Sequence, residues 1–220
     1  MNSKTISKAA TIIINGGLVV FPTETVYGIG ADATNPTAVE KIYKAKNRPK
    51  ANPIIVHVAH QKMLSKIASQ INPIEQLLID KFWPGPLTII FQRHQDMPGA
   101  VSAGQKTVAV RMPSNKIALE LIKKSKKPIA APSANISGKP SPTHHNQISQ
   151  EIRSRVGAVI EGGQCKHGVE STVVRVVDNE IIILRPGTIT KEQIEKDRES
   201  TQNTTERYKG SGCKHLKHVI

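Results

Sequence analysis

The chain has 220 residues, of which 38% are hydrophobic and only 3% aromatic, and Lys and Arg outnumber Asp and Glu by 31 to 17. This length suits one domain with its own hydrophobic core. The formal net charge of +14 indicates polyanionic ligands, such as nucleotide phosphates or RNA. The shortage of aromatic rings argues against nucleic-acid binding dominated by base stacking.

Neither a secretory signal nor an apolar stretch of membrane-spanning length is visible in the sequence. Cys165 and Cys213 are far apart and match no metal-binding spacing. We therefore expect a cytoplasmic protein with two free thiols and no membrane contact.

The N-terminal quarter predicts a strand, a turn, a helix and a second strand in succession. The apolar run at residues 18–21 indicates a short buried strand. Asn35 followed by Pro36 is typical of a helix start, and Pro49 is expected to stop that helix. Residues 53–58 predict the next strand.

The same patterns place further elements along the chain. Helices are predicted at residues 7–14, 63–68, 74–82, 117–123 and 146–156. Strands are predicted at residues 87–91, 107–113, 128–131, 172–174 and 181–184. Trp83, which follows the helix predicted at residues 74–82, is expected to plug an edge of the hydrophobic core.

A cluster of cations at the end of the helix that follows Asn35 suggests anion binding. It consists of Lys44, Lys46, Arg48 and Lys50, with no carboxylate between them. A solvated helix end explains the same pattern, because cations favour the negative end of the helix dipole. The hydroxyls of Thr23 and Thr25 favour a ligand site, since they follow a strand end, where α/β folds usually bind ligands.

Two arginines end predicted strands and are each followed closely by proline. Arg111 is one, and Arg185 repeats the pattern. An unpaired buried charge is costly, so Arg111 needs an anionic partner. A structural Asp or Glu is one candidate, but acids are scarce nearby in the sequence. A substrate carboxylate, which guanidinium binds through two parallel bonds, is at least as good a candidate.

The strand at residues 128–131 leads into a loop of small polar side chains that includes Ser133, Asn135 and Gly138. Such side chains and exposed backbone amides suit phosphate or ribose oxygens, although an ordinary Ser/Pro loop has the same composition. The spacing of a Walker motif is absent. The paired histidines of the chain lack Cys or acidic partners, so we expect no metal held by the protein.

Eight motifs occur in order within residues 17–189. They are PTETVYG, the K-x-R set of residues 46–48, NPIIVH, WPGPLT, TVAVRMP, APSAN with SGKPSPT, GVEST and LRPG. One such motif is a weak signal, but the ordered series resembles the YrdC-domain family.

The resemblance implies an α/β fold, with a single YrdC-like domain in residues 1–190. Its twisted mixed sheet would be flanked by helices around a concave basic cavity. Residues 191–220 are polar and resemble the start of the linker to a second domain in the family's long form. We hypothesise a descendant of that form without its second domain, and a mobile tail that folds over a bound nucleotide.

The resemblance also implies a nucleotidyltransferase reaction, in which L-threonine, bicarbonate and ATP give threonylcarbamoyl-AMP and pyrophosphate. A threonylcarbamoyl-transferase machinery would pass that product to the adenosine beside the tRNA anticodon, and direct contact with tRNA is a further expectation. Mg²⁺ is expected to arrive on the ATP phosphates.

Carrying the motifs over residue by residue assigns three sets of side chains. The catalytic residues would be Lys46 and Arg48, which stabilise charge on phosphoryl oxygens. L-threonine would be bound by Thr25, His57, Arg111 and Ser171, with Arg111 pairing its carboxylate. ATP would be bound by Arg48, Asn52, Thr107, Ser133, Asn135, Ser141 and Arg185.

Two other functions stay open on the sequence alone. A non-catalytic basic RNA-binding module explains the net charge, but not the two arginines at strand ends. A carbamoyl-transfer role in hydrogenase maturation is known for this domain within much larger chains, and the size of the present chain argues against it.

Overall fold

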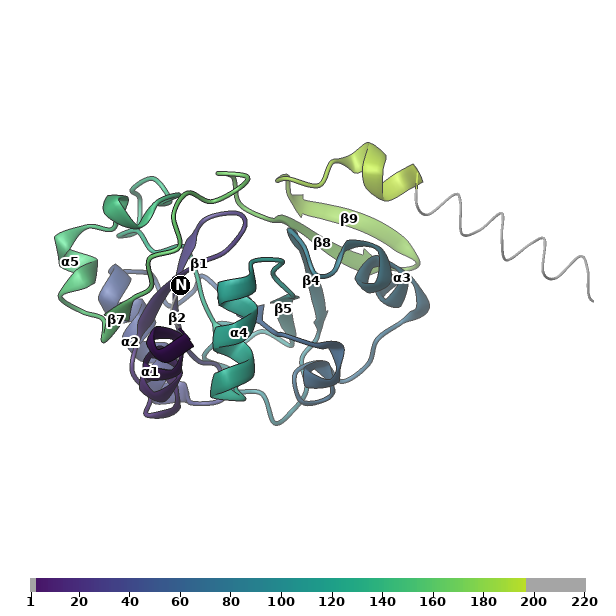
Figure 1. Ribbon diagram of the computed structural model, residues 1–220. Helices are drawn as coiled ribbons and strands as arrows, with labels where there is room; N and C mark the ends of the chain where they lie inside the picture. The colour runs from purple at the N-terminus through teal and green to yellow at the C-terminus, as the bar shows by residue number, and fades with distance from the viewer. Residues whose placement is uncertain (1–2, 197–220) are drawn as a thin grey trace, which may run out of the picture.

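The structure, a computed structural model, describes residues 3–196 (Figure 1). The labelled helices are α1 (Ser3–Ile14), α2 (Pro36–Lys46), α3 (Pro73–Phe82), α4 (Lys116–Ser125) and α5 (Gln150–Arg153), with 3-10 turns η1 (Gln61–Lys66) and η2 (His145–Gln147), and residues 191–196 are also helical. The strands are β1 (Val19–Pro22), β2 (Tyr27–Asp32), β3 (Val56–His57), β4 (Leu87–Gln92), β5 (Thr107–Arg111), β6 (Ile129–Ala130), β7 (Ala158–Val159), β8 (Thr172–Val177) and β9 (Glu180–Arg185).

Within the described residues, the strands form one nine-stranded sheet in the order β7-β1-β2-β6-β3-β5-β4-β8-β9. The pairs β1–β7, β3–β5 and β4–β8 are parallel, and the other neighbouring pairs are antiparallel. The α/β class and the mixed sheet implied by the resemblance are therefore confirmed.

Helices cover both faces of the sheet. On one face, α1 and α4 lie side by side (Figure 1), where Ile13 and Leu121 join a buried cluster that includes Phe21 of β1. On the other face, α2 contributes Ile42 to a second cluster that includes Val20, the neighbour of Phe21. Because successive side chains of a strand point to opposite faces, β1 is buried on both sides.

The predicted start of α2 is confirmed, but the helix ends at a different residue from the Pro49 that the sequence predicted. The Asn35 side chain accepts a hydrogen bond from the amide of Ala38 at 3.2 Å, and Pro36 takes the first helical position. Asn47 ends the helix in the left-handed conformation, with φ of 51°. This residue stops the helix before Pro49 is reached, because asparagine tolerates that conformation better than most side chains.

The strand β2 was not predicted, because its glycines resemble those of a turn. They are required by close packing: a Cβ at Gly30 would lie 2.6 Å from Ile129 Cγ2 and 2.7 Å from Phe21 Cε1. Glycine thus marks a close approach of neighbouring elements inside a strand.

Three other predictions need correction. The strand expected at residues 53–58 is reduced to the two residues of β3, and the helix expected at residues 63–68 is the 3-10 turn η1. The helix expected at residues 146–156 is wrong, because the chain forms η2, breaks, and restarts as α5 with Ser149 as its cap. Trp83 is buried as predicted, and its indole donates to the carbonyl of Leu87.

The expected boundary at residue 190 does not coincide with the edge of the packed region. Ile194 is only 3% exposed and belongs to the larger core cluster, so the described residues after 190 still pack on the domain. The rest of the predicted polar tail, with its proposed closure over a nucleotide, falls in residues 197–220, outside the described part. None of the described helices has the length and apolar character needed to cross a membrane.

Candidate active site

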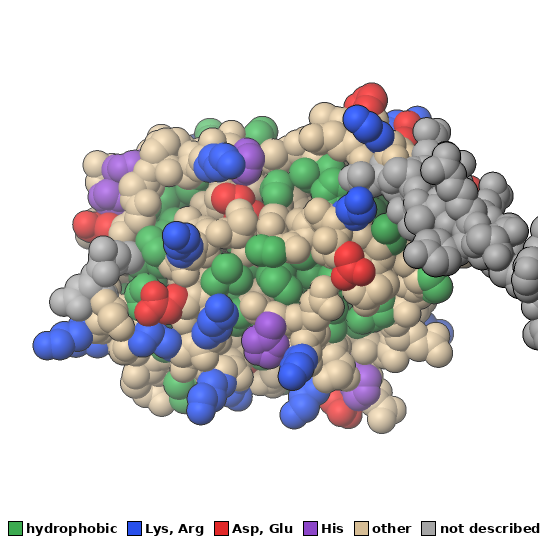
Figure 2. All heavy atoms as spheres, turned by 45° about the vertical axis from the view of Figure 1, so that its right-hand side comes forward, with side chains coloured by type: hydrophobic (Ala, Val, Ile, Leu, Met, Phe, Trp, Pro, Cys, Tyr) green, Lys and Arg blue, Asp and Glu red, His purple; other side chains and the backbone are tan. Residues whose placement is uncertain are grey.

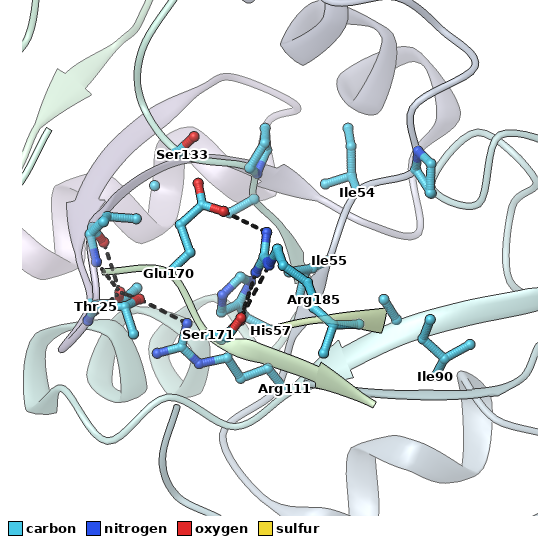
Figure 3. Close-up of a pocket in the computed structure, with 18 of the residues that line it drawn as sticks. Thr25, Ile54, Ile55, His57, Ile90, Arg111, Ser133, Glu170, Ser171 and Arg185 are labelled. Atoms are coloured by element: carbon cyan, nitrogen blue, oxygen red, sulfur yellow. Dashed lines mark hydrogen bonds and ion pairs between the residues drawn. The ribbon is translucent and has the colours of Figure 1, made fainter. Parts of the chain in front are cut away.

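A cavity of about 290 Å³ lies over the centre of the sheet (Figure 3). Its floor is one face of adjacent strands, made by His57 of β3, Ala109 and Arg111 of β5, Ile90 of β4 and Val173 of β8. The pairing register aligns His57 with Arg111 and Ile90 with Ala109 across neighbouring strands. This alignment places the side chains on the same face, because the strand repeat is two residues.

Loops from different directions form the walls of the cavity. The turn that carries Thr23 and Thr25 follows β1, and the segment that carries Ser133 follows β6, which runs antiparallel to its neighbours β2 and β3. The site therefore lies over a face of the sheet. Thr23 and Thr25 line the cavity from the turn at the end of β1, and His57 and Arg111 are the last residues of β3 and β5.

The cavity has a buried end and a half-exposed end. At the buried end, no side chain is more than 4% exposed, and the residues are Thr25, His57, Arg111 and Ser171. At the other end lie half-buried Arg48, Ser133, Glu170 and Arg185. The four residues expected to bind L-threonine thus share the end that is more enclosed.

Arg111 is held by three groups of the protein itself. One terminal nitrogen donates to Glu24 Oε1 at 2.5 Å, the other donates to Thr25 Oγ1 at 2.9 Å, and Nε donates to the carbonyl of Gly85 at 3.1 Å. The sequence left open a structural acid or a substrate carboxylate, and the structure supplies the acid. The residues near Arg111 in the sequence gave no sign of this, because Glu24 is distant along the chain and lies in the turn after β1.

His57 is neutral over the physiological pH range. Burial, with the nearby positive charge of Arg111, lowers the pKa of its imidazole to about 3. Its Nδ1 atom is buried without a hydrogen-bond partner in the described structure. An unsatisfied buried polar atom on a cavity wall is a contact point for a ligand, since such atoms are otherwise costly.

Arg185 is held by the segment just before β8. It donates from Nη1 to Glu170 Oε2 at 2.6 Å and from Nη2 to the Ser171 carbonyl at 2.9 Å. The other oxygen of Glu170 accepts from Ser141 Oγ at 3.0 Å. Glu170 was not among the predicted site residues, although the repeated Glu-Ser/Thr pairing of GVEST with the turn after β1 was visible in the sequence.

The expected cluster of four cations does not form. Only Arg48 lines the cavity, whereas Lys44 is exposed and Lys50 forms an exposed pair with Glu40. Lys46 is 1% exposed and donates to the carbonyls of the 133–135 loop. Burial and the charge of Arg48 lower the Lys46 pKa to about 8. Lys46 therefore fixes the loop that carries Ser133 and does not face the cavity.

Five of the predicted site residues lie outside the cavity lining. They are Lys46, Asn52, Thr107, Asn135 and Ser141. Asn52 offers its backbone carbonyl to Arg48, Thr107 begins β5, and Asn135 accepts from Ser133 Oγ at 2.6 Å. Within the described structure, Lys46, Asn52 and Asn135 thus support groups that do line the cavity.

The lining side chains do not form a metal site. Among residues 3–196, no group of three or more His, Cys, Asp or Glu side chains is placed to hold a metal ion. Among the described residues that line the cavity, Glu170 is the one acid, and Arg185 already pairs with it. This donor set does not fit a metal held by the chain itself.

Comparison with known proteins places the chain in a family. The family model Sua5_yciO_yrdC, described as telomere recombination, matches residues 11–187. The chain belongs to the Sua5/YciO/YrdC family. The resemblance found in the ordered motifs is therefore confirmed.

Members of the Sua5/YciO/YrdC family similar to this chain carry a common name. A threonylcarbamoyl-AMP synthase of Pyrococcus abyssi is 47% identical over 188 residues, which cover 86% of this chain and 55% of the relative. A putative threonylcarbamoyl-AMP synthase of Methanocaldococcus jannaschii is 39% identical over 177 residues. The match covers 80% of this chain and 83% of the relative. The chain thus spans about half the length of some relatives and most of others.

A solved structure of P. abyssi Sua5 complexed with L-threonine has the same fold. It superposes with a TM-score of 0.87 at 45% identity, over 90% of this chain and 58% of that one. L-threonine is therefore a ligand of a relative that shares this fold.

Proposed function

We propose that the chain forms threonylcarbamoyl-AMP and pyrophosphate from L-threonine, bicarbonate and ATP, as a nucleotidyltransferase of the cytoplasm. The observation that carries this proposal is the division of one cavity into an enclosed end and a half-exposed cationic end. A small amino acid suits the former and a triphosphate suits the latter. The relatives named threonylcarbamoyl-AMP synthase support the same reaction.

L-threonine would lie at the enclosed end. Arginine has five N–H donors, and Arg111 uses three of them on Glu24, Thr25 and Gly85. One N–H on each terminal nitrogen is left for a substrate carboxylate. The neutral imidazole of His57 would offer an acceptor to the substrate amine or hydroxyl. The complex of P. abyssi Sua5 with L-threonine supports this occupant.

ATP would lie at the half-exposed end, where Arg48, Ser133 and Arg185 offer cationic and hydroxyl donors to phosphate oxygens. Lys46 and Asn135 would act indirectly, by holding the loop that carries Ser133. Mg²⁺ would arrive on the ATP phosphates, because the described residues do not include a group of three or more His, Cys, Asp or Glu side chains placed to hold it.

The reaction needs no nucleophile from the protein. The amine of L-threonine either takes up carbon dioxide and releases a proton, or takes up bicarbonate and releases water, and both routes give a carbamate. A carbamate oxygen then attacks the α-phosphate of ATP, and the bond to pyrophosphate breaks. Arg48 would stabilise the charge that develops on the phosphoryl oxygens. Most of the rate would come from holding the two substrates in one cavity.

The product is a mixed anhydride, so it requires an acceptor that captures it before hydrolysis. We propose that a separate threonylcarbamoyl-transferase machinery transfers the group to tRNA. In Figure 2, several Lys and Arg side chains lie along the lower half of the face shown, and hydrophobic side chains group near its centre. Direct contact with tRNA stays a prediction.

The direct test measures pyrophosphate release with L-threonine and bicarbonate each omitted in turn. Release should require both. Arg48→Ala should keep the fold and lower the rate at least about 100-fold, whereas Lys50→Ala, which removes an exposed cation two residues away, should stay close to the wild-type rate. Release independent of L-threonine would refute the reaction. Salt-sensitive tRNA binding without turnover would favour the RNA-binding alternative.

A further inference from the structure

Glu170 is an unexpected side chain in an anion-binding cavity. It is the one carboxylate among the cavity-lining residues of the described chain, and the other charged groups there are Arg48, Arg111 and Arg185. In Figure 3 its side chain extends between Ser133 and Arg185. A carboxylate at this place repels an incoming phosphate unless it can move away.

Both oxygens of Glu170 accept hydrogen bonds from residues that the sequence motifs assign to ATP binding. Oε2 accepts from Arg185 Nη1 at 2.6 Å, and Oε1 accepts from Ser141 Oγ at 3.0 Å. Of these two residues, Arg185 lines the cavity, so the carboxylate occupies a guanidinium that a phosphate group would otherwise use. Its negative charge also raises the pKa of Lys46 and of Arg48, although burial lowers both overall, so it acts as the counter-charge of the cationic end.

The Arg185–Glu170 pair can exchange partners. Both side chains are 38% exposed, so water can replace either partner as they separate. Exposed ion pairs of this kind contribute little net free energy. The Arg111–Glu24 pair has side chains only 4% exposed, and its separation would leave an unpaired charge in the interior.

We propose that Glu170 is an internal counter-anion that holds Arg185 and Ser141 and is displaced from them by the phosphates of the nucleotide. The identity of the nucleotide rests on the function proposed above. The displacement lowers the affinity for ATP, because the ligand must replace an existing anion. Before the ligand arrives, Glu170 keeps the guanidinium of Arg185 oriented toward the cavity.

The test measures the Kd of ATP by calorimetry at fixed salt, without L-threonine or bicarbonate. Glu170→Gln keeps the shape of the side chain and removes its charge, so ATP should bind about five-fold more tightly, as expected for loss of a competing exposed ion pair. Glu151→Gln is the matched control, because Glu151 pairs with Arg155 outside the cavity and the two side chains have a similar exposure. This substitution also changes the net charge of the protein by the same amount. Its Kd should match the wild-type value within about two-fold.

A second pair of variants locates the effect. In an Arg185→Gln background, Glu170→Gln should no longer tighten ATP binding, because the competition acts through Arg185. Unchanged or weaker binding by Glu170→Gln alone would overturn the proposal, and weaker binding would indicate that Glu170 contacts the nucleotide. If Glu151→Gln tightened ATP binding equally, the change in Kd would be explained by net charge alone, and the proposal would be overturned as well.

Failure of the proposed reaction would look different. If the protein binds ATP but releases no L-threonine-dependent pyrophosphate, the proposed reaction is refuted. The counter-anion proposal is then still tested by the ratio of the Kd of ATP for Glu170→Gln to that for the wild type. Absence of ATP binding in the wild type and all variants would overturn both.

Discussion

Two arginines at strand ends face the same cavity with glutamate partners, yet their surroundings differ. Arg111 and Glu24 are 4% exposed, and the network continues into Thr25 and a backbone carbonyl. Arg185 and Glu170 are 38% exposed. The sequence pattern is the same in both cases, a Glu followed by Thr or Ser and a distant arginine before proline. Separation of the Arg111–Glu24 pair would leave an unpaired buried charge, whereas water can reach the Arg185–Glu170 pair, as the proposed displacement of Glu170 requires.

The largest expected effect is the loss of stability when the buried pair is broken. Arg111→Met leaves the Glu24 carboxylate buried without a cation, and the free energy of unfolding should fall by about 3–5 kcal/mol. Urea denaturation measures it. Arg111→Met with Glu24→Met is the control, since removing both charges should restore most of the loss. A loss below about 1 kcal/mol in the single variant would contradict the comparison.

The next effect tests how the segment before β8 is held. A Cβ at Gly187 would lie 2.5 Å from the Glu170 carbonyl oxygen and 2.5 Å from the Thr172 amide. Gly187→Ala should therefore cost about 1–3 kcal/mol and displace Glu170 and Ser171, with loss of ATP binding. At Gly99 a Cβ would meet a single backbone atom at 3.8 Å, so Gly99→Ala serves as the control. Wild-type ATP binding by Gly187→Ala would show that the segment adapts.

A smaller effect depends on pH and concerns His57, which lies on the floor beside Arg111. Its folded-state pKa of about 3 is below the value of about 6.5 in the unfolded chain, so the unfolded state binds the extra proton as pH falls below 6.5. Stability should fall by about 2 kcal/mol between pH 7 and pH 5 from this group. Urea denaturation of His57→Gln should show a correspondingly smaller fall. His60→Gln, at an exposed position, should retain the wild-type difference.

The smallest effect on stability is expected for the exchangeable pair. Arg185→Met should lower the free energy of unfolding by less than about 1 kcal/mol, because Glu170 is left half-exposed and hydrated. Pyrophosphate release should nevertheless fall about 100-fold, since a phosphate ligand is lost. A destabilisation as large as that of Arg111→Met would remove the distinction between the two pairs.

Much of the architecture follows from local patterns in the sequence. The capped start of α2, the buried strands β4 and β5, and the burial of Trp83 are determined by residues close in the chain. The ordered motifs also identified the family. Local patterns failed at β2, where glycines serve packing against other strands, and at residues 146–156, where Ser149 starts a new helix.

Sequence patterns were enough to find many of the residues that surround the cavity. Of the predicted site residues, the ones that line it are Thr25, Arg48, His57, Arg111, Ser133, Ser171 and Arg185. The environment of each residue, in contrast, follows from the folded structure. It buried Lys46 under the 133–135 loop, joined Glu24 to Arg111, and left Glu170 half-exposed beside Arg185. These outcomes depend on contacts between residues far apart in the chain, and the energy of a charge depends on how much water those contacts exclude.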